Sequence, residues 1–326
     1  MPRVIKEPSE NSVDISVVIP IFNEVDNIPL LTGRVLSVMR GMGRPFELIL
    51  VDDGSSDGSR DVYGPIAARE PELKIIRFRR NFGQTAAMAA GFDIACGEII
   101  VSLDGDLQNP PEEIPRLVDR LEGDDLDLVS GWRRERRDRA VSRKLPSFFA
   151  NRIISRITGV KLHDYGCSLK AYRAEILKDV QIYGELHRFL PVLVSMEGGR
   201  IAEMEVKHAP RTMGRSKYGI SRTYRVLMDL LTVTFLKQYG DRPQHAFGFF
   251  GVAMFGGGVL IDGYLAALKL FTGADIGARP LLLLGTLMII AGIQLLSIGL
   301  LSEVMARTYY ESQGKPRYRI REIVGE

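Results

Sequence analysis

Residues Ile99–Ile114 read IIVSLDGDLQNPPEEI, an apolar run that ends in two aspartates, an amide and two prolines. The opening IIVS has the length and near-continuous hydrophobicity of a strand that is buried on both faces. Asp104 and Asp106 follow this run, with Gly105 between them. Because ligands bind outside the carboxyl ends of the strands in an open parallel sheet, the stretch predicts a buried strand with a ligand site at its end.

Apolar segments of similar length alternate with helix-like segments from Asp14 to Gly131. The other strand-like segments are DISVVIP (14–20), FELILVD (46–52), LKIIRF (73–78) and DLVSG (127–131). Stretches such as TAAMAAGFDIA and PEEIPRLVDRLE have the pattern of helices that pack on a sheet. This alternation predicts an α/β fold with a mostly parallel sheet flanked by helices. Two later segments, LKAYR and IAEMEVKH, are candidates for additional strands.

The C-terminal third contains two apolar runs that predict a transmembrane hairpin. Residues 281–301 carry no charge and are long enough to cross a bilayer of about 30 Å at about 1.5 Å per residue. Residues 247–270 form the other run, and Ala253 with Gly257 raises the hypothesis of a homo-oligomer through close helix contact. Basic residues gather at the open ends of the hairpin, whereas the link holds Arg279 alone. The positive-inside rule therefore predicts an integral protein of the cytoplasmic (inner) membrane, with the α/β domain and both termini in the cytoplasm.

The 326 residues divide into five predicted parts. They are an N-terminal tail (1–13), a cytoplasmic α/β domain (14–221), an amphipathic juxtamembrane helix (222–245), the hairpin (246–304) and a cytoplasmic tail (305–326). The net charge of +3 gives no global argument for nucleic acid, and none is expected as a partner. Two cysteines favour a reducing compartment over a disulfide framework, and the charged first residues do not form a signal peptide.

Polar clusters follow three of the predicted strands. They are PIFNE (20–24), DDGSSDGS (52–59) and DGDLQ (104–108). Each alone could be a turn or a helix cap, but all three are expected at the same sheet edge. Carboxylates there could bind Mg²⁺ or Mn²⁺ and leave coordination positions for water and a substrate diphosphate. The chain has no GxxxxGK[ST] and no GxGxxG, which argues against a P-loop and a dinucleotide fingerprint.

The three clusters in this order resemble the GT-A glycosyltransferases of family 2. The segment DLQNPPE resembles in particular the polyprenyl-phosphate group, which includes dolichol-phosphate mannose synthase and the bacterial glucosyltransferases that load undecaprenyl phosphate. SGWR, DYGCSLKAYR, HRFLP and RTMGRSKYG extend the resemblance over essentially the whole chain, although relatives often read SGFRAF where this chain has CSLKAY. The resemblance implies a GT-A, Rossmann-like sheet and metal-dependent transfer of a hexose from a nucleotide sugar.

The resemblance also implies roles for individual residues. Nucleotide-sugar binding falls to Pro20, Phe22, Glu24, Val51, Asp53, Asp104 and Gly105, and metal binding to Asp104, Asp106 and Gln108. Asp164 matches the position often described as the catalytic base, and Arg211 and Lys217 are expected to contact the diphosphate. Our physical expectation is that Asp164 orients a sugar hydroxyl, an arginine or the acceptor, because a phosphate nucleophile needs no base.

The run RRERRDRAVSRK (133–144) holds seven basic and two acidic residues. It follows the fifth strand and precedes the apolar LPSFFANRIISRI, so it is expected to meet lipid headgroups rather than form only a solvated loop. We expect Arg133, Arg143, Lys144 and Ser147 to bind the acceptor phosphate, since guanidinium groups bind phosphate in a bidentate manner.

The resemblance implies, as the predicted reaction, the inverting transfer of glucose from UDP-glucose to undecaprenyl phosphate. UDP-galactose, a UDP-aminoarabinose derivative and GDP-mannose remain as alternative donors, and the choice between Mg²⁺ and Mn²⁺ is open. A rival class is a membrane transport or flipping component without catalytic activity. It predicts that Asp106→Ala leaves activity intact, whereas the enzyme hypothesis predicts loss of turnover.

Overall fold

The computed structural model describes residues 13–134, 152, 154–156, 158–180, 182, 186–210, 230, 243–277, 279–312 and 320–324. The chain forms two compact units. One contains the α/β domain together with the last residues of the chain, and the other contains the two long C-terminal helices. The predicted juxtamembrane helix at 222–245 lies almost entirely outside the described residues.

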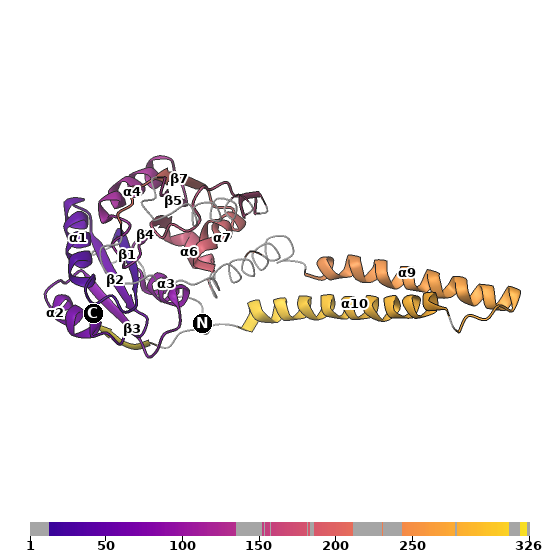
Figure 1. Ribbon diagram of the computed structural model, residues 1–326. Coiled ribbons are helices and arrows are strands. Elements are labelled where there is room, and N and C mark those ends of the chain that lie inside the picture. Colours follow the sequence, from indigo (N-terminus) through magenta and orange to yellow (C-terminus); the bar gives the residue numbers. More distant parts are fainter. Residues whose placement is uncertain are drawn as a thin grey trace. The chain divides into compact units, whose positions relative to one another are not determined.

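A single sheet of eight strands forms the α/β unit (Figure 1), in the order β7-β5-β6-β4-β1-β2-β3-β8. The strands are β1 Ile15–Ile21, β2 Phe46–Asp52, β3 Leu73–Phe78, β4 Ile99–Ser102, β5 Leu128–Trp132, β6 Lys170–Arg173, β7 Ile201–Glu205 and β8 Ile320–Val324. The pairs β1–β2, β1–β4, β2–β3 and β5–β7 are parallel, whereas β6 and β8 pair antiparallel to their neighbours. The prediction of a mostly parallel sheet flanked by helices is confirmed.

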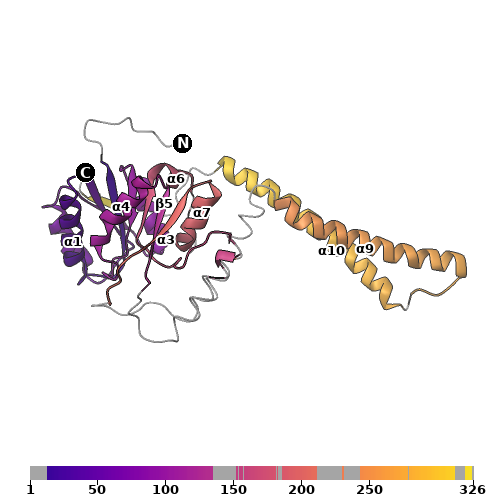
Figure 2. The same cartoon turned by 90° about the horizontal axis from the view of Figure 1, so that it is seen from above.

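Helices cover both faces of this sheet. They are α1 Ile28–Gly41, α2 Ser59–Ala67, α3 Gln84–Ile94, α4 Ile114–Gly123, α6 Ala174–Asp179 and α7 Leu190–Met196, with the 3-10 turns η1 Pro111–Glu113 and η2 Leu186–Phe189. One core cluster packs α1, α2 and α4 on one face, and a second packs α3, α6 and α7 on the other (Figure 2). The central strands are buried from both sides, which explains their continuous hydrophobicity.

The strand β8 comes from the C-terminal end of the chain, after the two long helices. It pairs antiparallel with β3, with Ile76 opposite Ile323 and Arg77 opposite Glu322. The sequence predicted only a cytoplasmic tail there, because the five-residue IREIV is too short and too charged to be recognised as a strand. The open edge of β3 supplies the partner that makes this segment a strand.

The second unit is a helical hairpin formed by α9 (Pro243–Thr272) and α10 (Pro280–Ser312). The segments Phe247–Thr272 and Pro280–Ser302 are long and apolar enough to cross a membrane. Many of their large apolar side chains are exposed in the isolated chain, as expected for surfaces that face lipid. The predicted hairpin is therefore confirmed, and α10 continues past the predicted span.

Glycines bring the two helices of the hairpin into close contact. A methyl group on Gly258 would lie 2.6 Å from the carbonyl oxygen of Gly285, so these helices approach along their backbones. Near this contact the hydroxyl of Thr286 donates to Asp262 Oδ2 at 3.2 Å. A methyl group on Gly257 would lie 2.9 Å from Met288 Cε of the same hairpin. This residue of the predicted small-residue pair faces α10, and a homo-oligomer stays a hypothesis.

Candidate active site

The loops that follow β1 and β2 are tied together at the carboxyl edge of the sheet. The backbone N–H of Asn23 donates to Ser55 Oγ at 2.9 Å, and Asn23 Oδ1 accepts from the N–H of Ser56 at 2.9 Å. The N–H of Val25 donates to Asp57 Oδ2 at 2.9 Å. Asn23 has a φ of 51°, a left-handed conformation that asparagine tolerates better than most residues. The first two polar clusters of the sequence therefore meet in one structure.

Asp57 is the carboxylate that joins these loops. Burial works to raise its pKa, but hydrogen bonds from Ser59 and from the backbone of Val25 outweigh burial and hold the pKa of Asp57 below its usual range. Asp57 is therefore an ionised acceptor at neutral pH, which favours a fixed loop geometry.

Four residues expected to contact the nucleobase or ribose lie on or near the ends of β1 and β2. Pro20, Phe22 and Glu24 are half-buried, so part of each is accessible to a ligand. Val51 is fully buried among the apolar side chains beneath α3, so any contact of this residue with a nucleotide would use its backbone. Their roles in nucleotide binding stay predictions.

Asp53 holds the loop between β3 and α3. Its two oxygens accept hydrogen bonds from the backbone N–H groups of Phe82 (2.6 Å) and Gly83 (2.9 Å). Burial raises the pKa of Asp53 above its usual value, although the two N–H donors oppose the shift. In the structure described here this carboxylate shapes a loop, and its predicted contact with the ribose stays a prediction.

The loop after β4 presents the two aspartates of the opening stretch. A methyl group on Gly105 would lie 3.1 Å from Ile21 Cγ2 and 3.3 Å from the carbonyl oxygen of Pro20, so the loop runs close against the end of β1. Gln84, the first residue of α3, donates from Nε2 to Asp104 Oδ1 at 2.7 Å. The side chain of Gln84, at the start of α3, therefore fixes the carboxylate of Asp104.

The charges of this loop suit a divalent cation. Burial, and after it the negative charge of Asp106, raises the pKa of Asp104 above its usual value. A cation would relieve this repulsion, and the carboxylates of Asp104 and Asp106 are the hard oxygen ligands that Mg²⁺ and Mn²⁺ prefer. Gln108 lies on the same loop, where its N–H donates to Asp106 Oδ1 at 3.2 Å. Among the described residues, no group of three or more acidic, histidine or cysteine side chains that could hold a metal ion is found.

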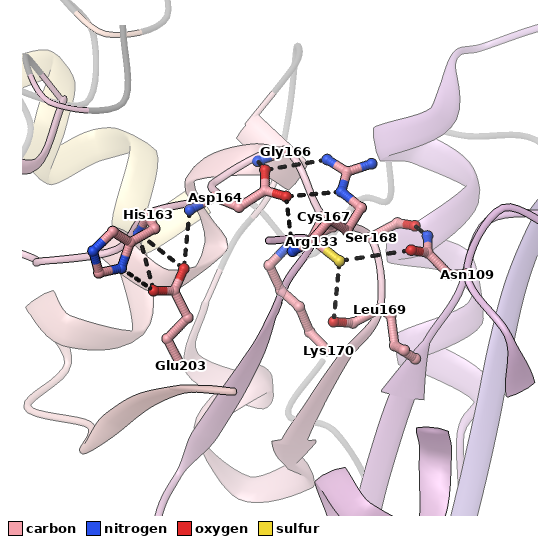
Figure 3. A network of polar contacts seen from close by, with 10 residues as sticks. All are labelled: Asn109, Arg133, His163, Asp164, Gly166, Cys167, Ser168, Leu169, Lys170 and Glu203. Carbon is pink, nitrogen blue, oxygen red and sulfur yellow. Dashed lines mark hydrogen bonds and ion pairs between the residues drawn. The ribbon is translucent and has the colours of Figure 1, made fainter. Parts of the chain in front are cut away.

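Asp164 and Arg133 form a buried ion pair near this loop (Figure 3). Arg133 donates from Nε to Asp164 Oδ2 at 2.7 Å and from Nη2 to Oδ1 at 3.1 Å. The N–H of Gly166 donates to Asp164 Oδ1 at 3.1 Å. Burial works to lower the pKa of Arg133, but the charge of Asp164, its hydrogen bonds and the charges of Cys167 and Asp104 together outweigh burial and hold that pKa above its usual value. The side chains are 12% and 4% exposed, so water screens the pair only weakly.

The segment from Asp164 to Lys170 connects this ion pair to the aspartate loop. Ser168 Oγ accepts from Asn109 Nδ2 at 2.9 Å, and the carbonyl of Ser168 accepts from Ser102 Oγ at 2.6 Å. Lys170 Nζ, which is buried, donates to the carbonyl of Cys167. The aspartate loop and the ion pair therefore share one network of hydrogen bonds, drawn in part in Figure 3.

A family model identifies the α/β unit. The model described as Glycosyl transferase family 2 matches residues 16–181, about half of the chain, and this range includes both aspartates of the loop, Arg133 and Asp164. The chain belongs to glycosyl transferase family 2. The predictions that the protein is a glycosyltransferase and that it resembles the polyprenyl-phosphate group are confirmed by the family model and by the relatives described next.

Two relatives match almost the full chain. The dodecaprenyl-phosphate galacturonate synthase of Rhizobium johnstonii is 48% identical over 315 residues, which cover 96% of this chain and 93% of the relative. The undecaprenyl-phosphate 4-deoxy-4-formamido-L-arabinose transferase of Shewanella sediminis is 38% identical and covers 98% of this chain and 95% of its own. Neither name contains glucose, the sugar that the sequence pattern favoured.

A solved structure has a similar fold. Glucosyl-3-phosphoglycerate synthase from Mycobacterium tuberculosis, in complex with Mn²⁺, UDP-glucose and phosphoglyceric acid, superposes with a TM-score of 0.53. It covers 71% of this chain and 85% of its own at 17% identity. At that identity the likeness shows the fold of the glycosyltransferase unit.

Several predicted site residues lie outside the described residues. They are Arg143, Lys144 and Ser147 of the expected acceptor site, with Arg211 and Lys217 of the expected diphosphate contacts. Of the expected acceptor residues the structure describes Arg133, whose guanidinium binds Asp164. Its neighbour Arg134, expected to carry membrane-surface charge, is exposed and pairs with Glu205 at 2.8 Å.

Sequence reasoning assigned no role to Gln84 or Glu203, although both contact predicted site residues. Gln84 follows the third strand-like segment, and it is therefore expected at the same sheet edge as the polar clusters. This position in the sequence could have identified Gln84 as a candidate site residue. Glu203 lies within a predicted strand, IAEMEVKH, where its charge is expected on an exposed face. Glu203 binds the backbone N–H groups of His163 and Asp164. These contacts form only when β7 pairs with β5, which the sequence pattern does not predict.

Proposed function

We propose that this glycosyltransferase transfers galacturonate from a UDP-linked donor to the phosphate of a polyprenyl phosphate, at the cytoplasmic face of the membrane. The observation that carries the proposal is the 48% identity, over nearly the whole chain, to a dodecaprenyl-phosphate galacturonate synthase. The same class of acceptor occurs in the name of the 4-deoxy-4-formamido-L-arabinose transferase, whose 38% identity makes that sugar the second candidate. Glucose loses its first place, because the glucose-binding neighbour is 17% identical and supports the fold alone.

The proposed chemistry is a single in-line displacement. An oxygen of the lipid phosphate attacks the anomeric carbon, the bond to the nucleoside diphosphate breaks, and the configuration inverts. A phosphate monoester has a second pKa of about 6, so the nucleophile is already anionic at neutral pH and needs no general base. Asp164 is bound to Arg133 by two hydrogen bonds and to the N–H of Gly166, an arrangement suited to orienting Arg133 toward phosphate.

Asp104, Asp106 and Gln108 would hold the divalent cation, Mg²⁺ or Mn²⁺. Bound there, it would neutralise negative charge that develops on the leaving diphosphate. Gln84 and the close approach of Gly105 to β1 keep the aspartates in place before the donor arrives.

The membrane orientation rests on the path of the chain. The strand β8, which follows α10, pairs with β3 in the same sheet that precedes α9. This path of the chain supports the proposal that both ends of the hairpin open on the same side of the membrane, in agreement with the positive-inside prediction.

A labelling experiment tests this orientation. Cys96 is exposed and Cys167 is buried, so a membrane-impermeant maleimide is expected to modify Cys96 only after lysis of the cells. In Cys96→Ser/Asp275→Cys, the new thiol lies in the link between α9 and α10, where the same reagent should react in intact spheroplasts. The reverse pattern would contradict the proposed topology.

The proposed reaction is tested with purified protein in detergent, undecaprenyl phosphate, Mg²⁺ or Mn²⁺ and a panel of radiolabelled sugar nucleotides. UDP-galacturonate is expected to transfer label to the organic phase, with UDP-4-deoxy-4-formamido-L-arabinose, UDP-glucose and GDP-mannose at least about ten-fold slower, the discrimination that about 1.4 kcal/mol in the transition state provides. EDTA should abolish transfer, and added Mn²⁺ or Mg²⁺ should restore it. Faster transfer from another donor would overturn the choice of sugar, and nucleotide binding without any lipid-linked label would overturn the acceptor.

A further inference from the structure

Glu203 lies on β7, at the edge of the sheet, and binds the segment that carries Asp164. Its carboxylate accepts from the backbone N–H of His163 at 2.9 and 3.0 Å and from the N–H of Asp164 at 2.9 Å. The side chain is only 10% exposed. Charge-assisted hydrogen bonds of this kind are stronger than neutral ones, so they fix the backbone of both residues.

The same carboxylate also holds the ring of His163. The atoms His163 Nδ1 and Glu203 Oε2 are 2.7 Å apart. The ring stacks on the indole of Trp132, with centroids 4.2 Å apart and planes inclined by 17°. Trp132 directly precedes Arg133, so the stack supports the end of the strand from which Arg133 extends.

Glu203 therefore reaches both partners of the buried ion pair. It holds Asp164 through the backbone (Figure 3). It also holds the His163 ring that stacks on Trp132, the neighbour of Arg133. The carboxylate of Asp164 points the other way and binds Arg133. Oε1 accepts from the backbone N–H groups of both His163 and Asp164, whereas Oε2 lies within hydrogen-bond distance of the N–H and of the ring Nδ1 of His163. An amide can keep the first two hydrogen bonds, but it removes the acceptor oxygen at the Oε2 position.

We propose that Glu203 is a positioning residue for the Arg133–Asp164 pair. Glu203 does not contact the reacting atoms. It fixes the position of the Asp164 carboxylate relative to the Arg133 guanidinium. The role rests on the proposed function, in which this pair orients the acceptor phosphate. Misplacement by about 1 Å can lower a rate by about 10²-fold, so a support of this kind affects turnover.

Glu203→Gln tests the proposal in the full-length protein. The amide NH₂ then replaces Oε2, the oxygen beside the N–H and the ring of His163, so His163 and its stack on Trp132 shift. We expect kcat to fall by about 10- to 100-fold while KM for the donor stays within about two-fold, because the hydrogen bonds of Glu203 in the described part of the chain go to His163 and Asp164 and not to the loops after β1, β2 and β4. Trp132 is the only tryptophan, so a changed emission should report the disturbed stack independently of turnover.

Glu205→Gln is the matched control. Glu205 lies two residues further along β7 and pairs with Arg134 on the surface, where both side chains are at least half exposed. Such a pair contributes little, so kcat should stay within about two-fold of wild type. If Glu203→Gln does not fold, His163→Ala should still lower kcat several-fold and change the emission of Trp132.

The outcomes separate the two proposals. Wild-type kcat in Glu203→Gln, or in His163→Ala where the first variant is unfolded, would overturn the positioning role while the transfer reaction stands. A loss of kcat that comes with unchanged Trp132 emission and a lowered Tm would also overturn it. Absence of lipid-linked product from the wild-type protein would instead count against the proposed function.

Discussion

Asp106→Asn is expected to lower kcat by about 10²- to 10³-fold, with the protein still folded. Asparagine keeps the size of the side chain but removes the charge that, with Asp104, is suited to a divalent cation. Loss of one group that stabilises developing charge typically has an effect of this size. The measurement is transfer of label to undecaprenyl phosphate under saturating donor, together with the Mn²⁺ concentration that gives half-maximal rate, which should rise.

Asp119→Asn provides the control for the change in charge. Asp119 is an exposed residue of α4 on the same unit, and it contributes no predicted ligand. It should retain wild-type kcat and the wild-type requirement for Mn²⁺. Normal turnover in Asp106→Asn would contradict the assignment of Asp106 as a metal ligand.

Asp164→Asn is expected to lower kcat by about 10²- to 10³-fold without changing the shape of its pH dependence. The amide cannot bind both nitrogens of Arg133, so it leaves a buried guanidinium without its charge partner. If Asp164 only orients Arg133, the pH dependence of the residual kcat should still follow ionisation of the lipid phosphate at about pH 6. A general base would instead add its own ionisation to the acidic limb, and that limb would disappear in the variant.

Two further variants sharpen this experiment. Arg133→Lys keeps the charge but loses the planar fork, so it should recover little of the activity. Glu122→Gln breaks a surface pair with Arg44 of similar two-bond geometry, at 2.9 and 3.0 Å, at the C-terminal end of α4. It should leave kcat unchanged, since exposed ion pairs contribute little. Separate, additive effects of Arg133 and Asp164 in a double-mutant cycle would argue against their action as a unit.

The sequence was a good guide to the central strands and to the sheet edge where the site lies. Strands β1 to β4 have continuous apolar runs, and their carboxyl ends carry the polar clusters that the structure joins through Asn23 and Asp57. The pattern was a poorer guide to the sugar. Positions that decide between glucose and galacturonate have no periodic or spacing signal, and only the comparison with relatives changed that choice.

Local chemistry also could not predict which charged groups bind each other. Arg133 was expected to face the acceptor phosphate, and the structure pairs it with a carboxylate 31 residues away. Asp53 was expected at the ribose, and it holds a loop 29 and 30 residues further on. Glu203 received no role, because its partners His163 and Asp164 are 40 and 39 residues away in the sequence.

The sequence by itself determined the elements of this glycosyltransferase. Short apolar runs became strands, and two long uncharged runs became a hairpin, because burial depends mainly on local hydrophobic pattern. Tertiary structure alone decided that β8 returns to the edge of β3, that Arg133 is paired with Asp164, and that Glu203 supports both. The reason is that hydrogen bonds and ion pairs are short-ranged and directional, so partners distant in sequence are chosen only when the sheet brings them together.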